Sequence, residues 1–380
     1  FRTVSHLPVT SSSSPFRLLV ACVRPGAEGE RADAVAARLS EATDWDRLLQ
    51  LAAHHRVRGP LYRGLMSLPP DRVPADVQDD LKSSARAAAL QNKFLIGEMG
   101  RVQSLLADTG VQSLAFKGPV LAYTVYRDGR YRHTRDIDLM VRPADFEHAK
   151  SLLLQDEYRP FRDRTASLLD RLGVYLNQQT ALIRGNTFAI DLHASLTPIV
   201  HASGAQFEGL WGRSVRQAVE GACIRLLHPR DRLLMLCQQA IKNRWNRLKY
   251  TCDVAECLWA TDELEGDLNW RALWDEAQQT AQARLLLANL FIAHELFQTP
   301  LPDFVHAEIE RDRHAKRIGR WGVRKLRSGL SSVGVSVSER MWLYWTVQDT
   351  VSHSIHYAGY SLVRNLWEQA QHVRSALRGP

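Results

Sequence analysis

Apolar residues recur at three- and four-residue spacing along most of this chain, a pattern that predicts helices. The first helical stretch covers residues 16–109, and its later part, residues 80–107, is rich in Ala, Leu, Lys and Arg. Two further stretches cover residues 231–260 and 270–297 and end before Pro300. Helices are therefore expected towards both ends of the chain.

Strand-like runs appear between residues 110 and 200. The predicted strands cover residues 111–116, 136–141, 174–183 and 187–192. A helix is expected after each of the first two, and Arg184-Gly185-Asn186 predicts a tight hairpin turn between the last two. This order predicts a small sheet of mixed direction, with a return to helix after Pro198. The expected fold class is α+β.

The pattern divides the chain into five segments, and its length favours two or three compact units. The segments are a trimmed end, tag scar or disordered leader (1–15), an N-terminal helical segment (16–109), an α/β core (110–200), an all-helical domain (201–302) and a basic helical tail (303–380).

The composition argues against a membrane or secreted protein. No apolar run approaches the roughly 20 residues that span a bilayer, and the polar start lacks the apolar centre of a secretory signal. The five cysteines are scattered and lack CxxC spacing, so reduced, buried thiols are expected rather than disulfides or a zinc site. We expect a cytoplasmic location and no membrane partner.

The net charge of +8 is concentrated in one stretch. Between Arg311 and Arg327, eight Lys and Arg residues face a single Asp312, so this stretch carries +7. It fits either a site for a polyanion such as RNA or a nucleoside triphosphate, or a solvated helix face.

Three aspartates at apolar runs provide the candidate chemistry. Side chains alternate along a strand, so Asp136 and Asp138 point to the same face with α-carbons about 6.6 Å apart. Asp191, between Ile190 and Leu192, fits a third carboxylate on a neighbouring strand. Mg²⁺ takes one or two carboxylates plus substrate phosphates, and a third carboxylate completes a two-metal site or deprotonates an attacking hydroxyl.

The pair of aspartates has a structural alternative. About four acidic pairs at this spacing arise by chance in such a chain, and a salt bridge to Arg132 or Arg135 also compensates a buried carboxylate. Lys117-Gly118 adds a second feature, because it ends a predicted strand and opens a helix. Free N–H groups, a glycine that permits close approach and a lysine charge favour an anion there.

Together these motifs resemble the DNA polymerase β-like nucleotidyltransferase superfamily. They are most similar to a bacterial nucleotidyltransferase family with a Lys-Gly turn, an Arg, Asp-Ile-Asp-Leu and a later Asp-Leu-His, here Phe116-Lys117-Gly118, Arg132, Asp136-Ile137-Asp138-Leu139 and Ile190-Asp191-Leu192-His193. The family's Lys-x-x-Trp-x-x-Leu-x-x-x-x-Asp arrangement matches Lys242, Trp245, Leu248 and Asp253. The resemblance covers roughly residues 45–302.

The resemblance implies a polymerase β-like core flanked by helices, and roles for individual residues. Asp136, Asp138 and Asp191 would be the catalytic and metal-binding carboxylates, with two Mg²⁺ ions, or Mn²⁺ in their place. The nucleotide-binding set would be Lys117, Gly118, Arg132, Arg135, Lys242, Arg247 and Lys249. The superfamily usually has Gly-Ser at the turn, whereas Pro119 follows Gly118 here, and Arg135 replaces a small polar residue.

The expected activity is transfer of a nucleoside monophosphate from an NTP such as ATP to an acceptor hydroxyl or phosphate, with release of pyrophosphate. The acceptor is a small molecule or RNA, including a tRNA end, and the sequence leaves this choice and the oligomeric state open. A non-catalytic nucleotide-binding or protein-interaction module on the same fold is the alternative. A sugar-nucleotide-dependent glycosyltransferase also uses Asp-x-Asp with a metal, but it needs a larger α/β domain than about 100 residues.

Overall fold

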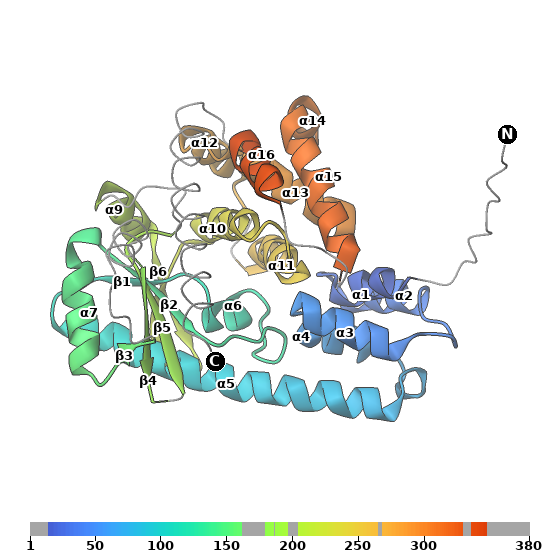
Figure 1. Cartoon of the computed structure of the whole chain (residues 1–380), viewed down its shortest axis with the longest axis horizontal. Helices are drawn as coiled ribbons and strands as arrows, with labels where there is room; N and C mark the ends of the chain where they lie inside the picture. The colour runs from blue at the N-terminus through green and yellow to red at the C-terminus, as the bar shows by residue number, and fades with distance from the viewer. Residues whose placement is uncertain are drawn as a thin grey trace, which may run out of the picture.

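The computed structural model describes residues 14–161, 179–185, 187–196, 204–264, 268–329 and 336–347. It is an α+β fold, as the sequence predicts, with one mixed sheet at one end of the molecule and helices around and beyond it (Figure 1). The predicted leader falls almost entirely outside the described residues, as do residues 174–178 of the third predicted strand.

Four short helices form the end of the molecule opposite the sheet (Figure 1): α1 (Pro15–Val23), α2 (Glu28–Ala36), α3 (Trp45–His55) and α4 (Arg58–Leu65). The side chain of Asp44 accepts a hydrogen bond from the backbone N–H of Arg47 and so caps α3. Helices α1 and α4 cross closely, because a Cβ on Gly64 would lie 2.2 Å from the carbonyl oxygen of Cys22. A short 3-10 turn, η1 (Pro70–Arg72), then leads into the next helix.

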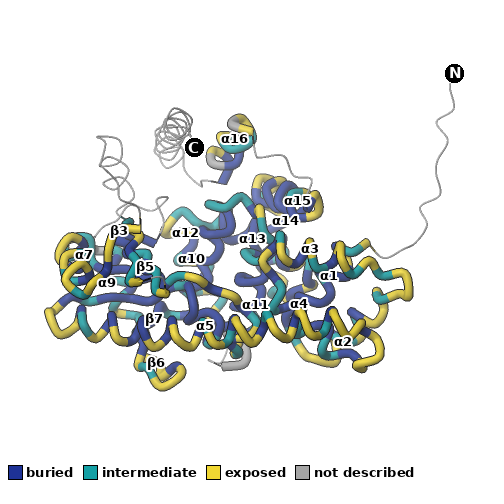
Figure 2. Tube along the Cα trace, turned by 60° about the horizontal axis from the view of Figure 1, so that its bottom comes forward, coloured by how far each residue is buried: buried dark blue, intermediate teal, exposed yellow. Residues whose placement is uncertain are grey.

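Helix α5 (Ala75–Asp108) joins these helices to the sheet (Figure 1). Its 34 residues extend for about 51 Å. One side of its second half packs on the sheet through Leu95, Met99 and Val102, while the outer side is exposed (Figure 2). The helix over residues 80–107 that the sequence predicts is therefore confirmed.

The sheet has the strand order β3-β4-β5-β2-β1-β7-β6. Its strands are β1 (Ser113–Ala115), β2 (Ile137–Val141), β3 (Arg159–Pro160), β4 (Gln179–Arg184), β5 (Phe188–His193), β6 (Val215–Val219) and β7 (Ala222–Leu226). β2 and β5 pair in parallel, as do β1 and β7, and the other neighbouring pairs are antiparallel. The predicted hairpin between β4 and β5 is confirmed, with Gly185 at a φ of 57°.

The predicted return to helix after Pro198 is only partly right: α9 (Gly204–Arg213) is helical, but β6 and β7 then form a hairpin that joins the sheet beside β1 before the later helices begin. β6 lies at the edge and exposes Arg216, Gln217 and Ala218, so its sequence lacks the apolar alternation of a half-buried strand. The sheet thus takes two strands from outside residues 110–200. The division of the chain into five segments stays a prediction.

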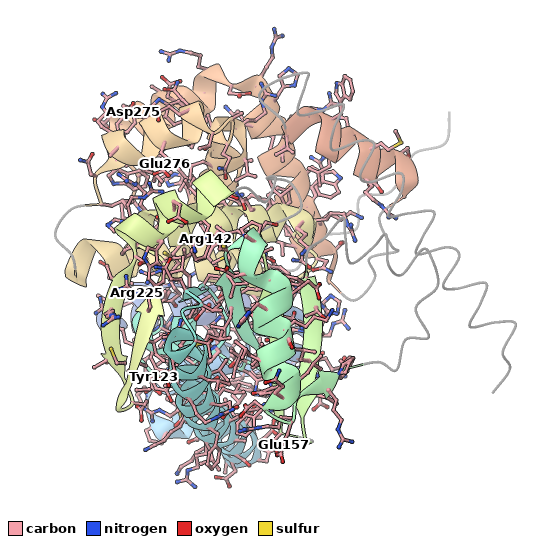
Figure 3. All side chains as sticks on the ribbon, turned by 90° about the vertical axis from the view of Figure 1, so that its left-hand side faces the viewer. Tyr123, Arg142, Glu157, Arg225, Asp275 and Glu276 are labelled. Carbon is pink, nitrogen blue, oxygen red and sulfur yellow. The ribbon has the colours of Figure 1, made fainter. Side chains whose placement is uncertain are left out.

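The two faces of the sheet contact different parts of the molecule. Ile137, Leu139 and Val141 of β2 point into one apolar cluster together with α5 and α7 (Phe146–Gln155). Met140 and Phe116 belong to the other cluster, which includes the later helices. The helices α6 (Pro119–Thr124) and α9 (Gly204–Arg213) and the turn η2 (Pro143–Asp145) complete this part. Arg142, directly after β2, bonds through Nε to Glu208 Oε1 of α9 at 2.6 Å (Figure 3).

The remaining helices lie above α5 in Figure 1: α10 (Pro229–Lys242), α11 (Leu248–Leu264), α12 (Trp270–Gln279), α13 (Ala283–Phe297), α14 (Asp303–Arg311), α15 (Arg313–Ser328) and α16 (Val337–Val347). The predicted stretch over residues 231–260 is two helices, because Arg244 and Trp245 have positive φ and reverse the chain. One apolar cluster joins these helices to α1–α4.

The cysteines are free, and four of them are buried as predicted, whereas Cys223 is exposed. Among the helices described, none has both the length and the apolar character that a membrane span requires.

Candidate active site

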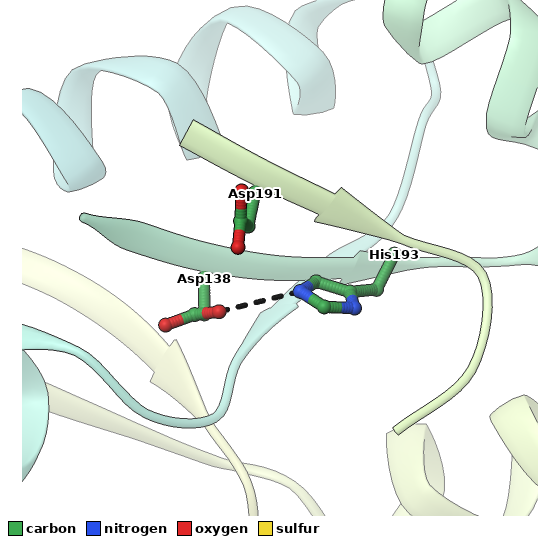
Figure 4. A group of neighbouring side chains, drawn as sticks. All are labelled: Asp138, Asp191 and His193. Atoms are coloured by element: carbon green, nitrogen blue, oxygen red, sulfur yellow. Dashed lines mark hydrogen bonds and ion pairs between the residues drawn. The ribbon is translucent and has the colours of Figure 1, made fainter. Parts of the chain in front are cut away.

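The parallel pairing of β2 and β5 brings the predicted carboxylates together. Asp138 lies opposite Asp191 in the register, and Met140 lies opposite His193. Because side chains alternate, Asp138, Asp191 and His193 share the face turned away from Ile137 and Leu139. Figure 4 shows the three side chains converging from the two strands. One ligand atom from each lies within 4.8 Å of the others, so the cluster can hold a metal ion.

Asp138 is the centre of this cluster and is almost fully buried. Its Oδ1 lies 2.7 Å from Lys117 Nζ and 3.2 Å from His193 Nε2 (Figure 4). Although burial raises its pKa, the lysine and histidine outweigh burial and bring the pKa well below the usual range. An ionised Asp138 only accepts hydrogen bonds, so Nε2 of His193 carries the proton.

His193 is a member of the cluster that the sequence did not assign. Burial lowers its pKa to about 4, so the ring is neutral near pH 7. The ring of Phe116 meets it edge-on at a centroid distance of 5.0 Å and fixes its plane. The Asp-Leu-His motif contains the signal, because the i, i+2 spacing from Asp191 places His193 on the same face of β5.

Asp191 is partly buried, and its Oδ2 accepts a hydrogen bond of 3.2 Å from Nε2 of Gln179 on β4. Burial, with the nearby charge of Asp138, raises its pKa to about 6. The charge of Lys242 on α10 opposes this shift, so that lysine lies close enough to act on the carboxylate. The pKa of Asp191 therefore lies closer to neutral pH than that of an ordinary aspartate.

Asp136 lies one residue before β2 and is partly exposed. It is not a member of the three-residue cluster, although burial and the charge of Asp138 raise its pKa. The structure thus brings Asp138 and Asp191 together with His193, whereas Asp136 lies just before β2 and outside this cluster. Its assignment as a metal ligand stays a prediction.

The Lys117-Gly118 turn packs directly against the start of β2. Gly118 has φ 73° and ψ −138°, and a Cβ there would lie 2.7 Å from the backbone oxygen of Asp136 and 3.5 Å from Asp138 Oδ2. Only glycine fits this backbone geometry and this approach. Pro119 occupies the first position of α6 and has no N–H to offer an anion. Lys117 remains the main cationic group of this turn.

Arg132 is buried and hydrogen-bonds to the Lys117-Gly118 turn. Its guanidinium donates through Nε and Nη2 to both carboxylate oxygens of Asp253 on α11, at 2.8 and 3.0 Å. Its Nη1 donates to the carbonyl of Gly118 at 2.7 Å, and the hydroxyl of Tyr126 also donates to Asp253. The predicted alternative, a salt bridge from the aspartate pair to Arg132, is wrong, because Asp253 is the carboxylate that Arg132 binds and Lys117 is the cation on Asp138.

The other predicted cationic residues have different positions. Arg135 is exposed, and Arg247 donates to the carbonyl of His54 at the end of α3. Lys249 is partly buried, and burial with the nearby Arg132 lowers its pKa to about 8, while Asp253 and Asp136 oppose the shift. Lys249 thus lies near both carboxylates, but burial and Arg132 disfavour its charged form. The nucleotide-binding roles of all these residues stay predictions.

Two buried ring side chains have structural roles. Trp245 is fully buried and donates through its indole N–H to Asn289 Oδ1 at 3.1 Å. His55 is buried and accepts from the backbone N–H of Leu248 through Nδ1.

Comparisons with known proteins complete the assignment. A search of curated proteins and a search of solved structures gave no match. A model of a family described as uncharacterised nucleotidyltransferase matches residues 41–298, more than half of the chain. This range contains the Lys-Gly turn, the carboxylate cluster and the Arg132–Asp253 pair. The chain therefore belongs to this nucleotidyltransferase family and is an enzyme of nucleotidyl transfer.

Proposed function

We propose that the protein is a Mg²⁺-dependent nucleotidyltransferase that moves a nucleoside monophosphate from an NTP to an acceptor hydroxyl or phosphate and releases pyrophosphate. The observation that carries this proposal is the convergence of Asp138 and Asp191, in register on two parallel strands, beside Lys117. Mn²⁺ is the proposed substitute ion.

The residues present fit a divalent cation. Asp138, Asp191 and His193 each offer one ligand atom within 4.8 Å of the others, and burial together with the charge of Asp138 raises the pKa values of Asp191 and Asp136. The missing side chain of Gly118 leaves Asp138 Oδ2 approachable. Carboxylate oxygens suit both Mg²⁺ and Mn²⁺. We propose Asp136, Asp138 and Asp191 as the holders of two ions. A bound ion would neutralise charge on the phosphoryl oxygens.

The residues of the chain supply the remaining functions. Lys117 and Lys242 would attract the triphosphate from two sides of the cluster, and Lys249 would add charge from α11. Asp191, opposite Asp138 on the neighbouring strand, would accept the proton of the attacking hydroxyl. Arg132 would keep the Lys117-Gly118 turn in place through the Gly118 carbonyl rather than touch the nucleotide. Catalysis would then rest on positioning and charge stabilisation.

Transfer of label from α-labelled NTPs tests this proposal. Wild type should label a component of a pool of cellular RNA and metabolites, in the presence of Mg²⁺, and Asp138→Asn should lose at least 100-fold. Asp79→Asn, the same chemical change at an exposed position on α5, is the control and should match wild type. Equal labelling by wild type and Asp138→Asn rejects the assignment. The labelled component identifies the acceptor as RNA or a small molecule.

One contact favours a second candidate function, a non-catalytic nucleotide-binding module. Lys117 already neutralises Asp138, so the cluster is compensated in part without an ion. Calorimetry separates the two candidates: NTP affinity that rises with Mg²⁺ supports the enzyme, and NTP binding of equal affinity in a chelator supports the module.

A further inference from the structure

Five arginines form a continuous stripe on helix α15. Arg313, Arg317, Arg320, Arg324 and Arg327 follow one another at intervals of four, three, four and three residues, which places them on one face of the helix. All five are exposed (Figure 2), whereas Ile318 and Leu326 on the other face are buried. The stripe extends for about 21 Å. The sequence left open whether these charges form a binding site or a solvated face.

The stripe is not neutralised by the protein. Within the described residues, none of its five guanidinium groups forms an ion pair with a carboxylate. The nearby carboxylates are engaged elsewhere: Glu310 binds Lys316, and Asp312 caps α15 and binds Arg284. Five like charges on one helix face repel one another, and a polyanion would relieve this repulsion.

Two hollows adjoin the stripe. One, of about 510 Å³, lies between α13, α14 and α15, with Arg320 and Arg324 beside the rings of Phe291, His294 and His306. The other, of about 810 Å³, lies between α1, α2 and the end of α13, and its basic residues include Arg17, Arg24 and Arg38. Both are lined by Glu295 and Arg327, so the two hollows adjoin, and we name them together the arginine groove. Seven basic side chains and two carboxylates line it.

The shape and lining of the groove select among polyanions. A concave groove suits a flexible strand better than a flat membrane surface, and aromatic rings beside arginines are the usual platform for unpaired bases. In a duplex the bases face each other and cannot stack on protein rings. We propose that the arginine groove binds single-stranded nucleic acid, with the backbone phosphates on the arginines of α15 and α1 and bases against the rings of the smaller hollow.

The groove is separate from the acidic cluster. Helix α15 packs on α13, and α13 packs on α10 and α11, the helices that carry Lys242 and Lys249. Binding in the groove therefore needs neither the carboxylates nor an NTP. The proposal goes beyond nucleotidyl transfer, and a failure of one leaves the other standing.

Fluorescence anisotropy with a labelled 20-nucleotide single-stranded RNA tests the proposal on the full chain. The test variant is Arg320→Gln/Arg324→Gln/Arg327→Gln. The control is Arg72→Gln/Arg86→Gln/Arg216→Gln, which removes the same charge from exposed positions on other elements. The test variant should bind at least ten-fold more weakly than wild type at 100 mM salt. Its slope of log K against log salt should be smaller by about 2, since each lost phosphate contact removes about 0.7.

The outcomes decide the proposal. Binding that survives in the control and falls in the test variant, with equal circular dichroism and melting temperature for both, supports it. Equal losses in the two variants overturn it, because net charge then explains the binding. Absence of RNA binding by wild type, equal affinity for a duplex of the same sequence, or binding to phosphatidylserine vesicles alone also overturns it.

Discussion

At the scale of residues, the candidate site combines one fully compensated carboxylate with two that are not. Asp138 shares Oδ1 with Lys117 and His193, so its charge is stabilised by the fold. Asp191 and Asp136 carry raised pKa values because burial and the charge of Asp138 outweigh the nearby cationic side chains. The site is thus strained electrostatically in its metal-free form, and this strain has measurable consequences.

Asp191→Asn should stabilise the metal-free protein. The folded pKa of about 6 exceeds the 3.8 of an ordinary aspartate, so ionisation of Asp191 costs stability as pH rises through this window. Asparagine removes the charge and can still accept the bond from Gln179. The variant should be more stable than wild type by about 1–3 kcal/mol at pH 8 in a chelator, and the difference should shrink towards pH 4. Urea unfolding at both pH values measures this, and a lower stability at pH 8 contradicts it.

Gly118→Ala should destabilise the protein more than Gly110→Ala does. Both glycines have positive φ, of 73° and 81°, so alanine is strained at either position. Only at position 118 does the added Cβ also meet a backbone oxygen, that of Asp136, whereas nothing lies within 4 Å at position 110. We expect a cost of about 1 kcal/mol for the control and at least about 2 kcal/mol for Gly118→Ala. Equal unfolding midpoints for the two variants would show that the close approach carries no energy.

The sequence predicted that Asp191 joins Asp138 from a neighbouring strand, because both aspartates stand in short apolar, strand-like runs. It did not predict which cation compensates each carboxylate. The partners of Asp138 and Arg132, Lys117 and Asp253, come from other elements, and their pairing depends on how α11 docks against the sheet. The pattern of residues along the chain does not indicate how α11 packs against the sheet.

At the scale of elements, the ion pair between Arg132 and Asp253 joins the turn before β2 to helix α11. Both residues are buried, with side-chain exposures of 6% and 4%, so neither charge has water to replace a lost partner. The pair also fixes the Gly118 carbonyl and thereby the turn that carries Lys117. The position of the lysine consequently depends on α11, a helix that begins more than 100 residues later in the chain.

Asp253→Ala should cost about 3–5 kcal/mol of unfolding free energy, because it leaves the guanidinium of Arg132 buried and unpaired. The double variant Arg132→Ala/Asp253→Ala should cost less than the sum of the single variants by about 2 kcal/mol. Asp128→Ala, at the largely exposed pair with Arg130, should cost less than about 1 kcal/mol. If the double variant loses as much unfolding free energy as the two single variants together, Arg132 and Asp253 are not energetically coupled.

Elements with strong periodicity were predicted, and elements that depend on their neighbours were not. Helix α5 and the β4–β5 hairpin follow from their own residues. The β6–β7 hairpin was not predicted because the exposed edge strand β6 lacks alternation of apolar and polar residues. The pairing of β7 with β1 also depends on the rest of the sheet. The break between α10 and α11 was also not predicted, since the residues between the two helices include no proline or glycine.

At the scale of the whole molecule, α5 is the common support of both ends. Its first half packs against α4, and its second half covers the sheet through residues that belong to the apolar cluster beneath β2 and β5. The sheet therefore depends on residues outside the predicted core of 110–200 on both sides, since β6 and β7 also lie beyond it.

A fragment of residues 110–380 should not fold, whereas a fragment of residues 75–380 should retain the sheet. Without α5, the apolar face formed by Ile137, Leu139 and Ile190 loses the cover of Leu95, Met99 and Val102. Circular dichroism and amide chemical-shift dispersion measure the difference. A cooperative unfolding transition from the shorter fragment would show that α5 is dispensable.

The pairing of β2 with β5 also sets which kinds of genetic change the enzyme tolerates. A single-residue deletion inside β5, between Phe188 and Asp191, would turn the acid towards Ile137 and Leu139 and place an aliphatic residue on the face that carries Asp138. Loss of one residue at Gly185, in the connecting turn, would shorten the loop without reversing that orientation. In a library of insertions and deletions, the variants that keep activity should therefore have their changes in the turn. Variants with a change inside the strand should be inactive, even at positions where point substitutions are accepted.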